Sequence, residues 1–242
     1  MPFEKELKFK TELSEKNVEE TANEQKKEFA KSEKEIAWDN KLKEIEEIKD
    51  PLGEKIDDGI KETVAAFNLN GLSTSGSCEG HLDHGTAAPW VEVSSPNQPE
   101  ERFIGEKEVF KKVAENMGVP LEEVRRGLQK NAWAEALEKS SEADETLEYR
   151  KWREENKKLI KKASELLEDF YQDKKVRPNI RLEISEVGPG GVFRVHNGGD
   201  DYKLDLERLT EKQKEKLKQR LPKYQKEMEG FGKFLKEKYF QE

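Results

Sequence analysis

The chain has 242 residues, 40% of them charged and 33% hydrophobic, and its formal net charge at pH 7 is −8. This acidic balance disfavours general nucleic-acid or anionic-membrane binding, which needs basic surface, and no apolar run approaches the roughly 20 residues of a membrane span. The single cysteine excludes an internal disulfide, and the first residues lack a secretory pattern, so we expect a cytoplasmic protein with no membrane partner.

Residues 1–49 form the first segment, which is rich in Glu and Lys and carries only a partial helical stripe of apolar residues: Phe29, Ile36, Leu42, Ile45 and Ile48. The stripe predicts a charged helical N-terminal extension, either a solvated helix or a coiled coil that binds a partner. Asp50-Pro51-Leu52-Gly53 ends it, because Pro and Gly together interrupt helices.

The composition changes after residue 50, and from Glu62 through Glu101 the chain contains no Lys or Arg. A short helix is predicted first, by Ile56, Ile60, Val64 and Phe67 at helical spacing. Strands are then expected at about residues 72–77 and 90–94, where the chain is extended or alternating. Between them lies a loop that holds most of the rare side chains.

The rest of the chain predicts a helical insertion over 103–174 and then a β-hairpin, with strands at about 180–186 and 192–196. The segment 204–242 reads as helical, with interruptions at Pro222 and near Gly230-Phe231-Gly232. We therefore predict an α+β fold, with a small antiparallel or mixed sheet packed by helices in a core of residues 50–203.

The loop in this core contains the only cysteine and two of the three histidines, as Ser77-Cys78-Glu79-Gly80-His81-Leu82-Asp83-His84-Gly85. A thiolate and two imidazoles suit zinc, with the distant His196 or water as fourth ligand. The sequence therefore predicts Cys78, His81, His84 and His196 as metal ligands. If the site is hydrolytic, Glu79 or Asp83 is the catalytic base that takes a proton from a metal-bound water.

Other interpretations of this loop stay open. Cys78 could be a nucleophile activated by His81 or His84, although acidic neighbours raise a thiol pKa rather than lower it. The loop could also be purely structural. In the strand 192–196, Arg194 and His196 share one face and the apolar residues take the other, so His196 either faces solvent or completes the loop site.

Residues 50–93 contain Gly71-Leu72-Ser73-Thr74, the Cys/His loop and Ala88-Pro89-Trp90-Val91. The stretch resembles an uncharacterised bacterial family of candidate-phyla genomes, and that resemblance implies no particular activity. The loop is also similar to the Ser-Cys-Ser-Gly-Arg loop of the wybutosine-synthesis methyltransferase family. Glu79 and His81 replace the last Ser and Arg of that motif, which speaks against a methyl-donor or nucleic-acid role.

A helix-turn-helix pattern spans residues 109–130, with Ala114 and Gly118 at the turn spacing of DNA-binding units. Glu122 and Glu123 occupy the positions where base-reading residues would lie, so we expect an ordinary helical hairpin and no nucleic-acid partner.

Two functions of different classes follow from the sequence. The first is a metal-dependent enzyme or metal-binding domain that takes a small molecule, with zinc as the expected cofactor. The second is a non-enzymatic helical interaction protein that binds a protein partner and in which the Cys/His loop is structural.

Overall fold

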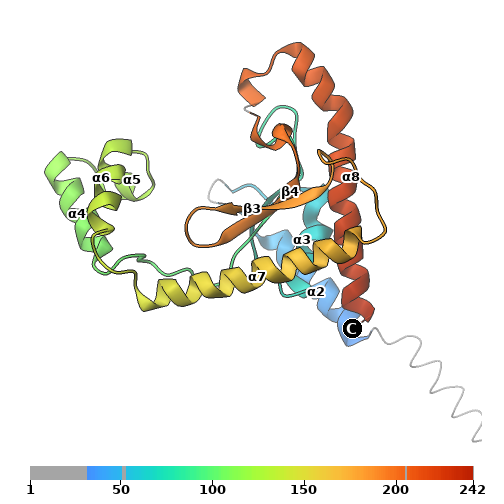
Figure 1. Ribbon diagram of the computed structural model, residues 1–242, viewed down its shortest axis with the longest axis horizontal. Helices are drawn as coiled ribbons and strands as arrows, with labels where there is room; N and C mark the ends of the chain where they lie inside the picture. Colours follow the sequence, from blue (N-terminus) through green and yellow to red (C-terminus); the bar gives the residue numbers. More distant parts are fainter. Residues whose placement is uncertain (1–31, 51–52, 205, 242) are drawn as a thin grey trace, which may run out of the picture.

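The computed structural model describes residues 32–50, 53–204 and 206–241. In this part of the chain seven α-helices accompany one four-stranded sheet, and the predicted α+β class is confirmed (Figure 1). The strands are β1 (Thr74–Cys78), β2 (Trp90–Val93), β3 (Leu182–Val187) and β4 (Val192–Asn197). The α-helices are α2 (Glu33–Glu47), α3 (Lys61–Leu69), α4 (Glu106–Met117), α5 (Leu121–Arg125), α6 (Lys130–Ser140), α7 (Leu147–Tyr171) and α8 (Glu211–Gln241). Three 3-10 turns, η1 (Asp58–Ile60), η2 (Asp200–Lys203) and η3 (Leu206–Arg208), complete the described elements.

The sheet has the order β1-β2-β4-β3, and every neighbouring pair is antiparallel. Directly opposed residues of an antiparallel pair share a face, so Val91 on β2 and Val195 on β4 lie together, as do Trp90 and His196. The first pair is fully buried in the main core. The second pair belongs to the opposite face, which is polar.

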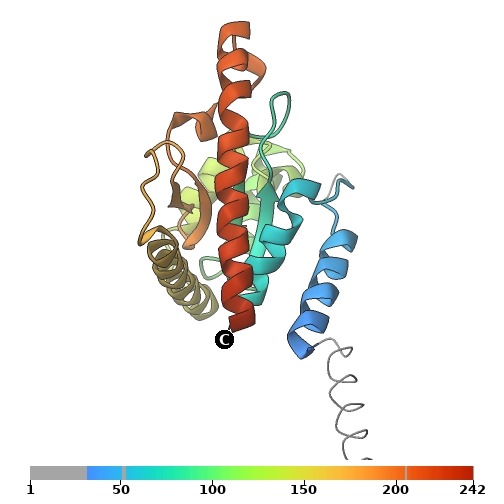
Figure 2. The same cartoon turned by 90° about the vertical axis from the view of Figure 1, so that its right-hand side faces the viewer.

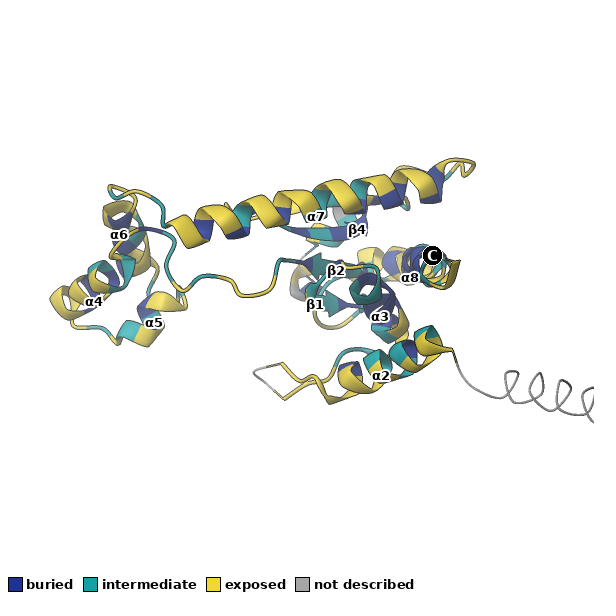
Figure 3. Ribbon diagram, turned by 90° about the horizontal axis from the view of Figure 1, so that it is seen from below, coloured by how far each residue is buried: buried dark blue, intermediate teal, exposed yellow. Residues whose placement is uncertain are grey.

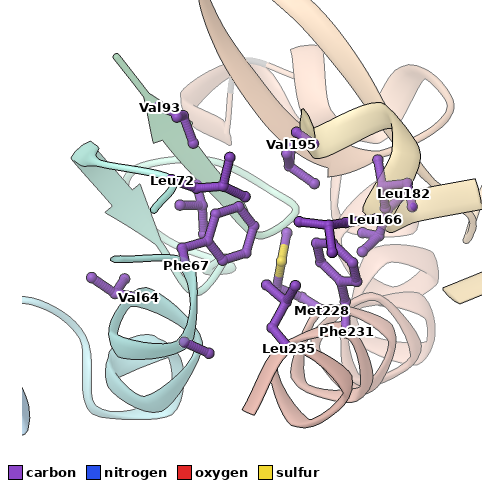
Figure 4. Close-up of a cluster of buried hydrophobic side chains, with 14 of the residues drawn as sticks. Val64, Phe67, Leu72, Val93, Leu166, Leu182, Val195, Met228, Phe231 and Leu235 are labelled. Carbon is purple, nitrogen blue, oxygen red and sulfur yellow. The ribbon is translucent and has the colours of Figure 1, made fainter. Parts of the chain in front are cut away.

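The main core lies between the apolar face of the sheet and the helices α3, α7 and α8. Phe67 of α3 and Phe231 of α8 meet edge-on, with 5.5 Å between ring centroids, and Figure 4 shows them beside Leu72, Met228 and Leu235. Edge-to-face rings at this distance are favourable beyond the area that they bury. Figure 2 shows α8 running along the molecule between α3 and α7.

Helices α4, α5 and α6 form a separate small unit with its own apolar cluster around Phe110, Val113 and Val124. Figure 3 shows this unit standing away from the sheet, joined to it by the segment after β2 and by the first turns of α7. The apolar residues that follow Pro120, from Val124 to Leu137, recur at helical spacing and suggest one helix, but the structure has two, α5 and α6. Gly127, with a left-handed φ of 69°, ends α5 early and separates it from α6.

The C-terminal helix also differs from expectation, because α8 continues through Pro222 and through the predicted interruption near Gly230-Phe231-Gly232. Gly232 lies where α8 crosses α3, and a Cβ built on it would come within 2.5 Å of Thr63 Oγ1. The glycine therefore permits close helix packing rather than ending the helix.

The N-terminal stripe falls partly outside the described residues, since Phe29 lies there. Helix α2 is held by a full capping box at Ser32 and Glu35, and it packs on α3 with Trp38 and Ile45 buried. Ile36 and Ile48 are exposed. Across the described part of the chain, none of the helices has the length and apolar character needed to cross a membrane.

Candidate metal centre

The Cys/His loop begins at the edge strand of the sheet. Cys78 is the last residue of β1 and pairs with Trp90, the first residue of β2, so the cysteine lies on a strand rather than in the loop where the sequence placed it. The connection 79–89 folds back over this strand end. Asp57, the residue before η1, approaches from the other side.

Asp57, Cys78 and His81 form a compact donor set. One ligand atom from each residue lies within 4.8 Å of the other two. The Nε2 atom of His81 lies 3.2 Å from Oδ2 of Asp57, and the same carboxylate oxygen accepts a hydrogen bond of 3.0 Å from the backbone N–H of Glu79. The cysteine is buried and the other two are partly buried. One sulfur, one nitrogen and one oxygen donor therefore converge on a common point.

Tight backbone geometry holds this donor set in place. The N–H of His81 donates to the carbonyl of Thr86 at 2.8 Å, which closes the loop. The N–H of Gly80 donates to Sγ of Cys78 at 3.4 Å. Gly80 has a φ of 84°, and a Cβ there would lie 2.9 Å from both Leu221 Cδ1 and Pro89 N. Only glycine fits this position, where the loop passes against α8.

Thr86 connects the thiol to the neighbouring strand. Its Oγ1 atom lies 3.4 Å from Sγ of Cys78 and 2.9 Å from the carbonyl oxygen of Ala88, and it accepts a 3.0 Å hydrogen bond from Nε1 of Trp90. The hydroxyl has one hydrogen to donate, and the sulfur and the carbonyl are its two acceptors. Thr86 therefore orients both the thiol and the indole ring.

His84 lies beside the donor set but outside it. Its ring stacks on that of His81 with 3.8 Å between centroids, and its Nδ1 atom lies 2.7 Å from Oδ1 of Asp83. Both side chains are exposed, at 66% for His84 and 84% for Asp83. The hydrogen bond from His84 lowers the pKa of the Asp83 carboxyl, which makes Asp83 the weaker base.

Glu79 points back toward the start of η1. Its Oε2 atom accepts a hydrogen bond of 2.8 Å from the N–H of Gly59, and a Cβ on Gly59 would come within 2.5 Å of that oxygen. Its carbonyl and that of Gly80 each lie 3.3 Å from Nε2 of Gln225 on α8. Glu79 thereby joins the loop to the segment that carries Asp57.

His196 lies two strands away from Cys78, since Cys78 pairs with Trp90 and Trp90 pairs with His196. The imidazole is buried and bound on both nitrogens: Nδ1 lies 2.8 Å from the carbonyl oxygen of Asn197, and Nε2 lies 2.7 Å from Oγ of Ser185. His196 is therefore occupied with partners on its own sheet rather than with the loop.

Asp57 is the donor that sequence reasoning did not find. It lies 21 positions before Cys78, where an acid next to the start of a helix is common and suits the helix dipole. The sequence offers one related feature, the absence of Lys and Arg from Glu62 through Glu101, but this feature does not distinguish Asp57 from the other carboxylates.

No protein-family model matches the chain, and no curated protein or solved structure matches it either.

Proposed function

We propose that the protein binds a divalent transition metal, with zinc as the best-suited ion, through Asp57 Oδ2, Cys78 Sγ and His81 Nε2. The observation that carries the proposal is the convergence of these three donors within 4.8 Å. Carboxylate, thiolate and imidazole are the three ligand types that zinc takes in proteins. Metal binding would pull them closer, since zinc–ligand bonds are about 2.0–2.3 Å long.

Charge supports a cation at this point. A deprotonated Cys78 and an ionised Asp57 bring two negative charges, which a divalent ion neutralises. The stretch from Glu62 through Glu101, which carries Cys78 and His81, contains no Lys or Arg. A metal would also keep the buried thiol deprotonated, because a coordinating thiol loses its proton.

Three protein ligands leave a fourth position, the arrangement of catalytic rather than structural zinc sites. A water there is the reactive group that a hydrolytic enzyme needs, and the candidate base is then Glu79, because Asp83 is exposed and paired with His84. His84 is the alternative fourth ligand, since its ring already stacks on His81. If His84 closes the coordination shell, the site is structural.

Elemental analysis tests the proposal directly. Protein purified without an affinity tag or chelator should contain close to one zinc per chain, and a Cys78→Ser/His81→Ala variant should lose it. The Asp58→Asn variant is a matched control, because Asp58 is the neighbouring exposed carboxylate, paired with Lys61, and it should keep the metal. The absence of metal from the wild type even after incubation with zinc would end the proposal.

A second function is supported by one specific observation. Sγ of Cys78 has two hydrogen-bonding neighbours in the loop that follows β1, the Gly80 N–H and the Thr86 hydroxyl, as a structural thiol would. In that case the protein is a helical interaction module, and the unit α4–α6, with exposed Leu128 and Trp133, is the surface to examine. Self-association or partner binding that survives Cys78→Ser would favour this function.

A further inference from the structure

The polar face of the sheet holds a second group of reactive side chains, on β3 and β4 rather than on β1. Ser185 on β3 is opposite Arg194 on β4, and His196 lies two residues further along β4 on the same face. Oγ of Ser185 lies 2.7 Å from Nε2 of His196. A serine hydroxyl within hydrogen-bond reach of an imidazole is the basic unit of an activated nucleophile.

The hydrogen bonds of His196 determine which ring nitrogen carries the proton. The partner of Nδ1, at 2.8 Å, is the backbone carbonyl of Asn197, which can only accept. Nδ1 is therefore protonated, and in the neutral ring Nε2 is the acceptor of the Ser185 hydroxyl proton. Burial lowers the pKa of His196 and so favours the neutral ring. Nε2 of the neutral imidazole can therefore accept the proton of the Ser185 hydroxyl.

The ring of His196 is also fixed in orientation. Tyr202 of η2 stacks on it with 3.9 Å between centroids and only 11° between planes. The hydroxyl of Tyr202 in turn accepts a 3.2 Å hydrogen bond from Nη1 of Arg194. An oriented base next to a hydroxyl is the arrangement that serine-dependent acyl transfer requires.

Ser185 is open to a substrate where His196 is not. β3 is an edge strand, Ser185 is partly exposed, and its neighbours on the same face, Glu183 and Val187, are exposed. Arg194, directly opposite, places a guanidinium on this face, where Nε donates to Glu92 at 2.8 Å and Nη1 to the Tyr202 hydroxyl. A guanidinium has five N–H donors, and those that remain can stabilise negative charge that develops on an acyl oxygen. A tetrahedral acyl intermediate carries such a charge, so the group suits carboxylic esters.

We propose that Ser185 and His196 form a nucleophile–base pair that hydrolyses small carboxylic esters, independently of the metal centre. Oγ of Ser185 attacks the ester carbonyl carbon while its proton passes to Nε2 of His196. The bond from that carbon to the alcohol oxygen breaks, and the alcohol leaves with the proton. Water then adds to the acyl-serine, gives its proton to Nε2, and the acid departs as Oγ regains a proton. The sum is ester plus water giving acid plus alcohol.

The test uses two probes on the full chain, a fluorophosphonate that labels activated serines and p-nitrophenyl acetate as a small ester. Wild type should be labelled on Ser185, as located by peptide mass, and should release nitrophenol faster than the Ser185→Ala variant. His196→Gln should slow labelling by roughly 100-fold or more, since a positioned general base contributes about 10²–10⁴. Ser141→Ala is the matched control, because Ser141 is exposed and its hydroxyl donates to the Glu138 carbonyl instead of a histidine.

Two comparisons keep the outcome decisive. Labelling of Ser185 and zinc content are measured on the same wild-type sample, so failure of the metal centre and failure of the serine are separately visible. If His196→Gln does not fold, the labelled peptide in wild type and the rate of Ser185→Ala carry the result. Label absent from Ser185, or an ester rate equal in wild type and Ser185→Ala, would overturn the proposal.

Discussion

The imidazole of His81 and the carboxylate of Asp57, 24 residues apart in the sequence, lie 3.2 Å from each other. This relationship joins the turn that precedes α3 to the loop that follows β1. It also gives the candidate metal centre a charged oxygen donor that the loop itself does not supply. The same carboxylate accepts a hydrogen bond from the backbone N–H of Glu79. Asp57 therefore has two roles, as a hydrogen-bond acceptor that holds the loop and as a candidate metal ligand, and a substitution can separate them.

Asp57→Asn is expected to weaken zinc binding while leaving the fold nearly intact. The amide keeps an oxygen that can accept the Glu79 N–H, but it loses the negative charge that attracts the ion. Loss of an outer-shell partner already costs about 10–100-fold in metal affinity, so loss of a charged ligand should cost at least that much. Competition with a chromophoric chelator measures the affinity. Equal zinc affinity in Asp57→Asn and Asp58→Asn would exclude Asp57 as a ligand.

Gly80→Ala should be clearly more destabilising than Gly188→Ala. Both glycines have left-handed φ values, 84° and 71°, which cost a non-glycine residue about 1–2 kcal/mol. A Cβ at Gly188 meets nothing within 4 Å, whereas one at Gly80 would lie 2.9 Å from Leu221 Cδ1 and Pro89 N. Overpacking adds about 1–3 kcal/mol. Urea unfolding of both variants measures the difference, and similar losses would show that the loop moves away from α8 freely.

The sequence predicts the parts of this fold that depend on local periodicity. The alternation in 192–196 correctly places Phe193 and Val195 on the core face and Arg194 and His196 on the other, because one buried face imposes a period of two on any strand. It does not predict that His196 is itself buried, neither facing solvent nor completing the loop site. The sequence does not predict that α8 passes unbroken through Gly232. Gly232 is required by its close packing on Thr63, which is 169 positions away in the sequence. Rules that read Gly as a local helix breaker do not include such a tertiary contact.

Only some residues of the candidate site can likewise be predicted from the sequence. Cys78 and His81 are found from the sequence because rare residues cluster there, and Gly80 and Gly85 indicate an irregular loop. Asp57 joins them only through the tertiary fold, and among the many acids of this chain nothing local distinguishes it. His196 was grouped with the loop by residue type alone, while its position two strands away depends on the strand order.

Gly232→Ala and Gly230→Ala should change stability in opposite directions although they lie two residues apart on α8. In an open helix position, replacing glycine by alanine stabilises by about 0.5–1 kcal/mol, and a Cβ at Gly230 would have Phe170 Cζ as its nearest contact at 3.7 Å. A Cβ at Gly232 would lie 2.5 Å from Thr63 Oγ1 and 3.0 Å from Thr63 Cα. Thermal unfolding should therefore show a raised midpoint for the first variant and a lowered one for the second. A raised midpoint in both would mean that α8 and α3 can separate without loss.

Asn156→Leu should destabilise by about 2–6 kcal/mol. This fully buried amide of α7 accepts the Ser95 N–H at 2.5 Å and donates to the Gly190 carbonyl at 2.8 Å. Leucine has a similar volume but leaves both backbone groups unpaired, at about 1–3 kcal/mol each. Ser164→Ala, which removes one bond from a partly buried hydroxyl to the Ile160 carbonyl on the same helix, should cost far less. Equal denaturant midpoints for the two variants would show that the bonds from Asn156 to Ser95 and Gly190 do not contribute to stability.

His196 should make the stability of the protein depend on pH in a defined direction. Burial is the main cause that lowers the pKa of His196 below its ordinary value of 6.5, so in the acid range the unfolded chain binds this proton more readily than the folded protein does. Stability rises with pH wherever the unfolded state holds more protons. The contribution is thus fully present above pH 6.5 and is lost as pH falls from there toward the lower folded pKa. Urea midpoints at pH 7.5, 6.5, 5.5 and 5.0 should fall more steeply for wild type than for His196→Gln. A wild-type slope in His196→Gln would mean that other groups carry the acid dependence.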